Sequence, residues 1–219
     1  MEKPRRDVRA LSLDELRRFF TSHSVPAFKG DQVYQWLWNK GSHDFLGMTN
    51  LSKSHRELLE EHFVINHIAV DQLQRSDDGT IKNAIRLHDG YLVESVLIPT
   101  DTRSTACVSS QVGCSLDCHF CATAKLKRMR NLNPDEIYDQ VVEIDKQSQL
   151  YFNRPLTNIV FMGMGEPLMN YKNTLTAIEK ITSADGLGMS PKRITVSTSG
   201  ITKIIPVSYT HLTLPTTVF

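Results

Sequence analysis

The stretch CVSSQVGCSLDCHFCATAK, residues 107–125, contains all four cysteines of the chain. Three of them follow one another in the spacing Cys114-x3-Cys118-x2-Cys121. Three thiolates in one loop can hold a [4Fe–4S] cube by three of its irons, which leaves the fourth iron open to another ligand. We therefore predict an iron–sulfur cluster bound by Cys114, Cys118 and Cys121.

Two other interpretations of the cysteines stay open at this point. A structural zinc site needs a fourth tetrahedral ligand, and His119 is wedged between two cysteines, where we expect its side chain to point elsewhere. A disulfide framework needs an oxidising compartment. The first residues, MEKPRRDVRALSLDELRRFF, are too charged for a signal peptide. We therefore favour reduced thiols and the cluster.

An open iron beside an electron-rich cluster suits the one-electron cleavage of S-adenosylmethionine, in which the cofactor carries the chemistry and the protein positions it. The spacing of the cysteines, with the aromatic Phe120 just before the last one, resembles that of the radical S-adenosylmethionine (radical SAM) superfamily. The resemblance implies S-adenosylmethionine as a second cofactor.

Composition sets wide limits on the rest of the chain. With 219 residues, 40% of them hydrophobic and 22% charged, it can form one large or two small domains. No apolar run approaches the length of a membrane span, so we expect a cytoplasmic protein without a membrane partner. The net charge of +1 gives no general basic surface, and any contact with nucleic acid must be local.

The first hundred residues predict helices and then a meander of strands. Apolar residues at helical spacing predict helices over about 13–20, 31–40 and 52–62, the first opened by a capping box at Ser12 and Glu15. Strands follow over 68–74, 80–87 and 91–98, separated by the hairpin signals Asp78-Gly79 and Asp89-Gly90. We expect a small helical accessory domain over 1–66 and a β-meander over 67–100.

From about residue 105 the pattern becomes strand, loop and helix in repetition. Strands are predicted over 105–109, 158–162 and 193–197, and helices over 134–150 and 171–183. This alternation predicts an α/β fold with a parallel sheet covered by helices, whose ligands bind at the carboxyl ends of the strands. The cysteine loop, the run GMGEP (163–167) and the run STSG (197–200) all follow strands, so we expect them to meet on one rim.

The two later runs have plausible roles at such a rim. Gly163 and Gly165 lack a Cβ, which allows close approach of a ligand to the backbone. Glu166 can accept hydrogen bonds from a cationic amine, and Ser197 can hold a ribose hydroxyl. The structural alternatives are an ordinary turn and a helix entry.

Longer motifs resemble one family within the superfamily. The runs VESVLIP (93–99), CVSSQVGC (107–114), NIVFMGMGEPL (158–168) and RITVSTSG (193–200) are similar to those of the bacterial dual-specificity adenine carbon-2 methyltransferases of the RlmN type. The resemblance extends over about residues 11–205. It implies that Gly165, Glu166 and Ser197 bind S-adenosylmethionine, and that residues 101–206 form the N-terminal half of a partial (β/α) radical SAM barrel.

The resemblance also assigns two residues outside these loops. Glu94 matches the proton acceptor of the family, and Cys107 matches the cysteine that resolves a protein–RNA intermediate by a disulfide with a C-terminal cysteine. Glu94 alternates with the apolar residues Leu92, Val96 and Ile98, so we expect burial to raise its pKa. The structural alternatives are a solvated acid on an exposed face and a buried strand thiol.

The activity implied by the resemblance is radical methylation of adenine carbon 2 in 23S rRNA and certain tRNAs. One S-adenosylmethionine methylates a C-terminal cysteine and a second is cleaved to generate the radical that carries this methyl group to adenine. A reducing electron donor such as flavodoxin and a monomeric enzyme are expected. The alternatives are the related methyltransferase acting on adenine carbon 8 and a non-catalytic zinc-binding RNA module.

Clustered basic residues are candidate contacts for the phosphates of RNA. They are Lys125, Lys127, Arg128, Arg130, Lys192 and Arg193 near the rim, and Arg5, Arg6, Arg9, Arg17 and Arg18 in the accessory domain.

The tail over 207–219 continues no motif of the family and resembles a translated sequencing adapter. We expect the tail to be an artefact, and the chain as written to lack the methyl-carrying cysteine and hence methyl transfer.

Overall fold

The computed structural model describes residues 5–116, 118–119, 121–201 and 205. The aromatic residue Phe120 and the tail 207–219 therefore lie outside the described residues. The chain divides into two compact units, one running to His67 with the segment Ser183–Gly188, and the other formed by Ile68–Thr182 and the chain from Met189 onward.

The first unit contains the three predicted helices. These are α1 (Leu13–Ser22), α2 (Phe28–Trp38) and α3 (Lys53–His62), with a short 3-10 helix η1 (Val8–Ala10) and a parallel pair of strands, β1 (Arg6–Asp7) and β2 (Phe63–Val64). The capping box is confirmed, because the Ser12 hydroxyl accepts from the Glu15 N–H and the Glu15 carboxylate accepts from the Ser12 N–H. The apolar stripes form the core, with Leu16, Phe20, Val33, Leu37 and Leu59 buried.

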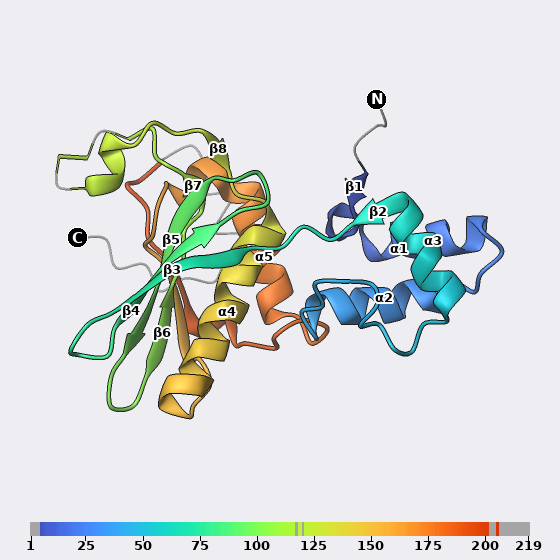
Figure 1. Cartoon of the computed structure of the whole chain (residues 1–219). Helices are drawn as coiled ribbons and strands as arrows, with labels where there is room; N and C mark the ends of the chain where they lie inside the picture. The colour runs from blue at the N-terminus through green and yellow to red at the C-terminus, as the bar shows by residue number, and fades with distance from the viewer. Residues whose placement is uncertain (1–4, 117, 120, 202–204, 206–219) are drawn as a thin grey trace. The chain divides into compact units, whose positions relative to one another are not determined.

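The second unit is built on a six-stranded sheet (Figure 1). Its order is β10–β9–β6–β5–β4–β3. The strands are β3 (Ala69–Arg75), β4 (Ile81–Arg86), β5 (Leu92–Pro99), β6 (Ser104–Cys107), β9 (Asn158–Phe161) and β10 (Ile194–Val196). Gly79 and Gly90 have φ values of +84° and +86°, the left-handed conformation that the two predicted hairpin turns require.

The sheet is mixed, because the strands of the predicted meander and those of the predicted parallel sheet belong to one sheet. Strands β3 to β6 pair antiparallel in chain order, and β6, β9 and β10 pair parallel. The meander therefore continues directly into the sheet through the pairing of β5 with β6. The parallel prediction is confirmed for the three strands that precede the cysteine loop and the two glycine-containing loops.

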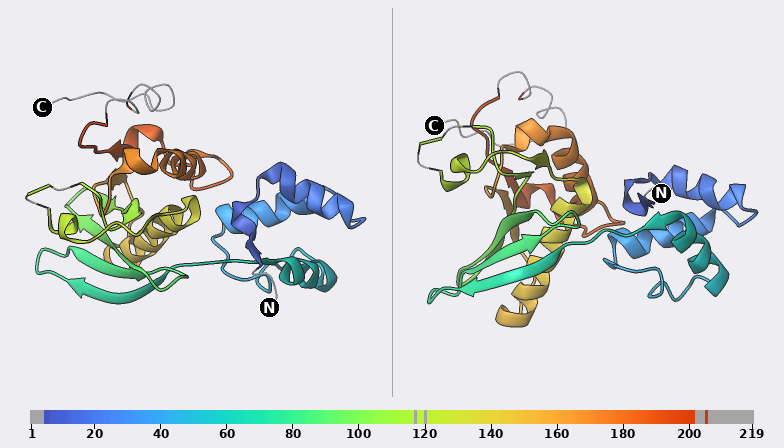
Figure 2. Two further views of the ribbon diagram at one scale, coloured as in Figure 1. Left: turned by 90° about the horizontal axis from the view of Figure 1, so that it is seen from above. Right: turned by 45° about the horizontal axis from the view of Figure 1, so that its top comes forward.

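Two helices connect the parallel strands and cover one face of the sheet. They are α4 (Pro134–Phe152) and α5 (Tyr171–Thr182), and both lie on the same side (Figure 2). On this side Val93 and Leu97 of β5 are buried, while Leu92 and Ile98 on the opposite side are 46% and 39% exposed. One face of the sheet is thus packed and the other is open within the described part of the chain.

The remaining elements are short, and all of them except η4, which precedes β10 at the opposite edge of the sheet, lie near the loops of the rim. They are the two-stranded pair β7 (Gln111–Val112) and β8 (Arg130–Asn131) and the 3-10 helices η2 (Ala122–Lys125), η3 (Pro167–Asn170) and η4 (Pro191–Arg193). None of the helices in the described residues has the length and apolarity needed to cross a membrane.

Candidate cofactor site at the carboxyl ends of the parallel strands

Three loops meet where the three parallel strands end. The cysteine loop follows β6, the GMGEP loop follows β9, and the STSG loop follows β10. The Ser110 N–H donates to the Met164 carbonyl at 2.9 Å, which joins the first loop to the second. The Thr198 hydroxyl donates to the Glu166 carboxylate at 2.7 Å, which joins the second to the third. The predicted meeting of the three motifs is confirmed.

The cysteine loop is held at its base by the β7–β8 pair. Gln111 pairs with Asn131 and Val112 with Arg130, and the Cys114 N–H donates to the Leu126 carbonyl at 3.3 Å. Gly113 has φ +73°, and a Cβ there would overlap the backbone of the returning arm. A side chain at this position would therefore push the two arms apart, which explains the glycine before Cys114.

The three cysteines form a soft donor set on this single loop. The Leu116 N–H donates to the Cys114 sulfur at 3.4 Å, and the Cys121 N–H donates to the Cys118 carbonyl at 3.0 Å. Burial works against ionisation of Cys121, but hydrogen bonds from Ala124 and Thr123 outweigh it and hold the pKa of this thiol below its usual value. N–H groups directed at sulfur and a stabilised thiolate fit an iron–sulfur cluster.

The grouping of the cysteines as ligands stays a prediction. Within the described residues, no three His, Cys, Asp or Glu side chains are gathered closely enough to hold one metal ion. The assignment rests on the donor types, on their spacing and on their shared loop.

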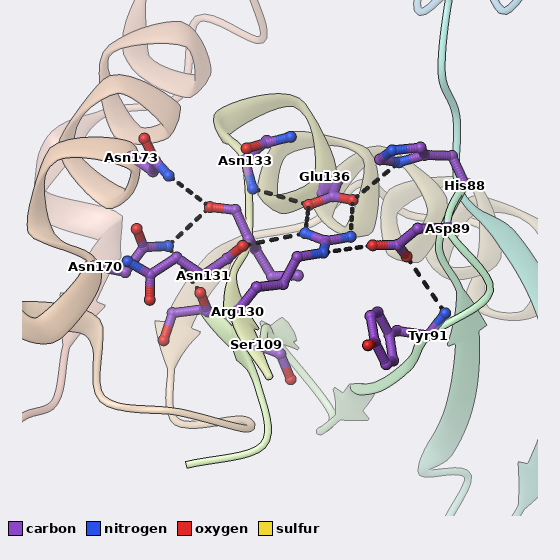
Figure 3. Close-up of polar contacts among 12 residues, drawn as sticks. His88, Asp89, Tyr91, Ser109, Arg130, Asn131, Asn133, Glu136, Asn170 and Asn173 are labelled. Atoms are coloured by element: carbon purple, nitrogen blue, oxygen red, sulfur yellow. Dashed lines mark hydrogen bonds and ion pairs between the residues drawn. The ribbon is translucent and has the colours of Figure 1, made fainter. Parts of the chain in front are cut away.

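The returning arm of the cysteine loop is anchored by Arg130 (Figure 3). Its guanidinium donates two parallel hydrogen bonds of 2.8 Å to the Glu136 carboxylate, and its Nε donates to Asp89 at 2.5 Å. Glu136 also accepts from the Asn133 N–H, which closes the capping box of α4. The hydrogen bonds to Glu136 raise the pKa of Arg130, so the group is a permanent cation here.

This anchoring corrects one of the predicted RNA contacts. The Arg130 guanidinium is taken up by Glu136 and Asp89 and is not presented to phosphates. Lys125 and Lys127 are exposed on the same loop and stay candidates. In the first unit Arg17 binds Asp31 and Asp14, so its charge is also largely compensated within the protein.

Two asparagines anchor the same arm on its other side (Figure 3). Asn170 donates to the carbonyls of Ser110 and Leu132, both at 2.8 Å, and Asn173 donates to the Leu132 carbonyl at 2.8 Å. Because Asn170 is buried, its amide bridges both arms of the loop base to η3 without competition from water.

The glycines of the GMGEP loop pack against the protein itself. A Cβ on Gly163 would lie 2.7 Å from the Ser109 hydroxyl, and one on Gly165 would lie 2.5 Å from the Gln111 Cβ. Gly165 also has φ +92°. The expected close approach of a ligand to these glycines is therefore not what requires them, because strand and loop residues after β6 already fill that space.

The Glu166 carboxylate binds protein donors rather than open solvent. One oxygen accepts from the Leu168 N–H at 2.9 Å and from the Thr198 hydroxyl, and the other accepts from the Ser199 N–H at 2.8 Å and its hydroxyl at 3.0 Å. A carboxylate has about four acceptor positions. A ligand amine at Glu166 must therefore replace one of the two hydroxyl donors.

The expected burial of Glu94 is wrong. The alternation of Glu94 with Leu92, Val96 and Ile98 is confirmed, but this row lies on the open face of the sheet. The Glu94 side chain is 50% exposed and forms an ion pair with Lys82 at 2.6 Å. Alternation predicts which residues share a face and does not tell which face the helices cover.

Cys107 and Glu94 nevertheless lie on the same face. Cys107 ends β6 and pairs with Val96, and Glu94 is two residues from Val96 along β5. Diagonal neighbours of this kind in an antiparallel pair are about 7–8 Å apart. Ser197, the third residue expected on the rim, is exposed directly after β10.

We expect the Cys107 thiol to react slowly with alkylating agents. Burial raises its pKa, although a hydrogen bond from Met162 opposes the shift, so little thiolate is present near neutral pH. In a variant with Cys114→Ser, Cys118→Ser and Cys121→Ser, iodoacetamide should modify Cys107 at least about tenfold more slowly in the folded chain than in urea. The folded rate should still rise above pH ~8.5. The modification is measured by mass spectrometry. Equal rates of Cys107 modification in the folded chain and in urea would contradict this prediction.

Several residues of the site were not predicted from the sequence. Gln111, Arg130, Glu136 and Asn170 all hold the loops together, and Gln111 and Glu136 are almost fully buried. Gln111 stands inside the CVSSQVGC run, between Ser110 and Val112, and nothing in the run marked it as buried. In residues 130–136 the sequence indicated only a basic cluster and the start of a helix. The ion pair of Arg130 with Glu136 could not be predicted, because it depends on the fold.

Two families of known proteins match separate parts of the chain. The family described as "Ribosomal RNA large subunit methyltransferase N-terminal domain" matches residues 7–65, and the radical SAM superfamily matches residues 108–205. A solved radical SAM methyltransferase from Sphaerobacter thermophilus superposes with a TM-score of 0.82 at 36% identity, covering 93% of this chain and 60% of that one.

Named relatives agree with these matches. A probable dual-specificity RNA methyltransferase RlmN from Flavobacterium psychrophilum is 70% identical over 94% of this chain, and the RlmN of Geotalea uraniireducens is 43% identical over 89%. The chain spans 59% and 55% of the lengths of these two proteins. Over the part of their length that it spans, the chain is therefore similar to proteins of the RlmN family within the radical SAM superfamily.

Proposed function

We propose that the cysteine loop holds a [4Fe–4S] cluster through Cys114, Cys118 and Cys121, beside an S-adenosylmethionine site formed by Gly165, Glu166 and Ser197. The observation that carries this proposal is the hydrogen-bonded meeting of the three loops at the ends of β6, β9 and β10. When bound, a reduced cluster of this kind supplies the electron that cleaves S-adenosylmethionine.

The protein residues then have defined tasks. Gly113 and the β7–β8 pair keep the arms of the cysteine loop together, so that the thiolates are presented from one side. Glu166 fixes the STSG loop through Thr198 and Ser199, and exchange of one hydroxyl donor for the amine of the ligand would hold the methionine end. Ser197, which directly precedes Thr198 in the chain, would bind a ribose hydroxyl of the ligand.

We propose that the whole protein methylates carbon 2 of adenine in 23S rRNA and in certain tRNAs through a methyl-cysteine intermediate. The relatives carry the name of dual-specificity RNA methyltransferases, and they are similar over almost all of this chain. Glu94 would accept the proton of the adenine carbon, and Cys107 would resolve the protein–RNA intermediate. Their position on one open face of the sheet supports joint action on one substrate.

A substrate base on this face must be taken out of its stack. Proteins reach the edges of RNA bases mainly in single-stranded or splayed loops. The exposed Lys125 and Lys127 on the cysteine loop are suited to neutralise phosphates beside such a base. We further propose that a reducing protein such as flavodoxin supplies the electron and that the enzyme works as a monomer in the cytoplasm, where its RNA substrates are made.

A chimaera tests the substrate and the position of methylation. Residues 1–205 of this chain would be joined to the C-terminal part of the F. psychrophilum relative, and the reconstituted protein would be incubated with a 23S rRNA fragment, S-adenosylmethionine and a reductant. We expect 2-methyladenosine in the digested RNA. Formation of 8-methyladenosine would assign the other carbon, and absence of both nucleosides while the intact relative is active would overturn the proposal.

A further inference from the structure

Gln111 is a buried amide that hydrogen-bonds in two directions at the base of the cysteine loop. Its side chain is 0% exposed. The amide nitrogen donates to the Asn131 side chain at 2.7 Å, across the β7–β8 pair. The amide oxygen accepts from the Glu166 N–H at 2.9 Å, in the GMGEP loop. One side chain thus connects both arms of the cysteine loop to the residue proposed to hold S-adenosylmethionine.

Packing fixes the same contact in space. A Cβ on Gly165 would lie 2.5 Å from the Cβ of Gln111 and 2.7 Å from its Cγ, so the GMGEP backbone rests directly on this side chain. The Gln111 N–H also donates to the Met164 carbonyl at 3.2 Å. The position of the GMGEP loop relative to the cysteine loop therefore depends on the length and shape of this residue.

The connection continues beyond Asn131. Its amide nitrogen donates to the Met169 carbonyl in η3 at 3.4 Å, while its oxygen accepts from Gln111. The direction of both amides is determined, because each uses its oxygen toward a donor and its nitrogen toward an acceptor. A replacement that lacks either group leaves a buried partner without its hydrogen bond.

We propose that Gln111 is a positioning residue that sets the S-adenosylmethionine loop at its working place relative to the three cysteines. This rests on the cofactor sites proposed above. Gln111 contacts neither cofactor in this role and acts through the Glu166 backbone and through Asn131. Its removal should weaken the binding of S-adenosylmethionine more than the accompanying loss of stability explains.

A second buried amide provides a matched control. Gln147 of α4 is 4% exposed and forms two reciprocal hydrogen bonds of 2.9 Å with Asn83 of β4. It lies in the same unit as Gln111, toward the C-terminal end of α4, away from the start of the helix that anchors the cysteine loop. Gln111→Met and Gln147→Met each keep a long unbranched side chain and each remove the amide hydrogen bonds described above.

The test compares these two variants of the full 219-residue chain after anaerobic reconstitution. Both should lower the melting temperature by a few degrees. Gln111→Met should weaken S-adenosylmethionine binding by about tenfold or more, measured by equilibrium dialysis, while Gln147→Met should change it by less than about twofold. Equal weakening in the two variants, or none in Gln111→Met, would overturn the positioning role.

Amide hydrogen exchange without any cofactor separates this inference from the proposed function. Exchange at Glu166 should become at least about tenfold faster in Gln111→Met and stay unchanged in Gln147→Met, because only Gln111 accepts from that N–H. Unchanged exchange at Glu166 in Gln111→Met would overturn the connection itself. The wild-type chain could bind neither iron nor S-adenosylmethionine while exchange at Glu166 is still faster in Gln111→Met than in the wild type. That result would overturn the proposed function and the cofactor part of this role, but not the loop connection.

Discussion

Cys118→Ala will abolish iron binding by the chain. Wild-type protein reconstituted without oxygen should hold about four iron atoms and show the brown colour of a cubic cluster, because its three thiolates can hold three of the four irons of the cube. With Cys114 and Cys121 alone, iron content should fall below about a tenth of that value. Formation of 5′-deoxyadenosine from S-adenosylmethionine under a strong reductant should fall to background, because no electron reaches the cofactor.

Cys107→Ala is the control for this result, since it removes a cysteine outside the loop. Cys107 ends β6, and burial raises its pKa, so it is a poor source of thiolate. Iron content should stay at the wild-type level in this variant. Iron retained by Cys118→Ala would refute the three-thiolate assignment. A colourless wild-type chain with bound zinc would instead support the structural zinc module.

Local patterns predicted the elements of this fold well, because each depends on nearby residues. The capping box at Ser12 and the Asp-Gly turns determine where helices and hairpins begin, and the predicted strands and helices recur within a few residues of their observed bounds. The meeting of the three loops was also predictable, since parallel strands bring their carboxyl ends to one edge.

The wrong predictions all concern the tertiary surroundings of a side chain or of a glycine. Glu94 was expected to be buried, but its row of side chains lies on the open face of the sheet. The glycine at 165 indicated a close approach, yet the sequence pattern could not tell a ligand from the side chain of Gln111. Arg130 counted as one of several basic residues until the fold placed Glu136 and Asp89 around it. Such pairings arise from tertiary contacts that no local period encodes.

Glu136→Gln is expected to give the largest loss of stability among single polar substitutions in the second unit. Glu136 is 3% exposed on its side chain, and the substitution replaces one half of a bidentate ion pair with a neutral amide. Removing one partner of a buried pair leaves the other charge poorly compensated, here Arg130 with Asp89 alone. We expect the free energy of unfolding to fall by about 3 kcal/mol.

The two tryptophans allow this loss to be assigned to the correct unit. Trp36 and Trp38 both belong to α2 in the first unit, so fluorescence in urea follows that unit, and far-UV circular dichroism follows both. Glu136→Gln should shift the dichroism transition of the second unit and leave the fluorescence transition in place. Lys82→Met breaks the exposed pair with Glu94, at 47% and 50% exposure, and should cost less than about 1 kcal/mol. Equal losses in the two variants would show that burial of the Arg130–Glu136 pair does not hold the cysteine loop to α4.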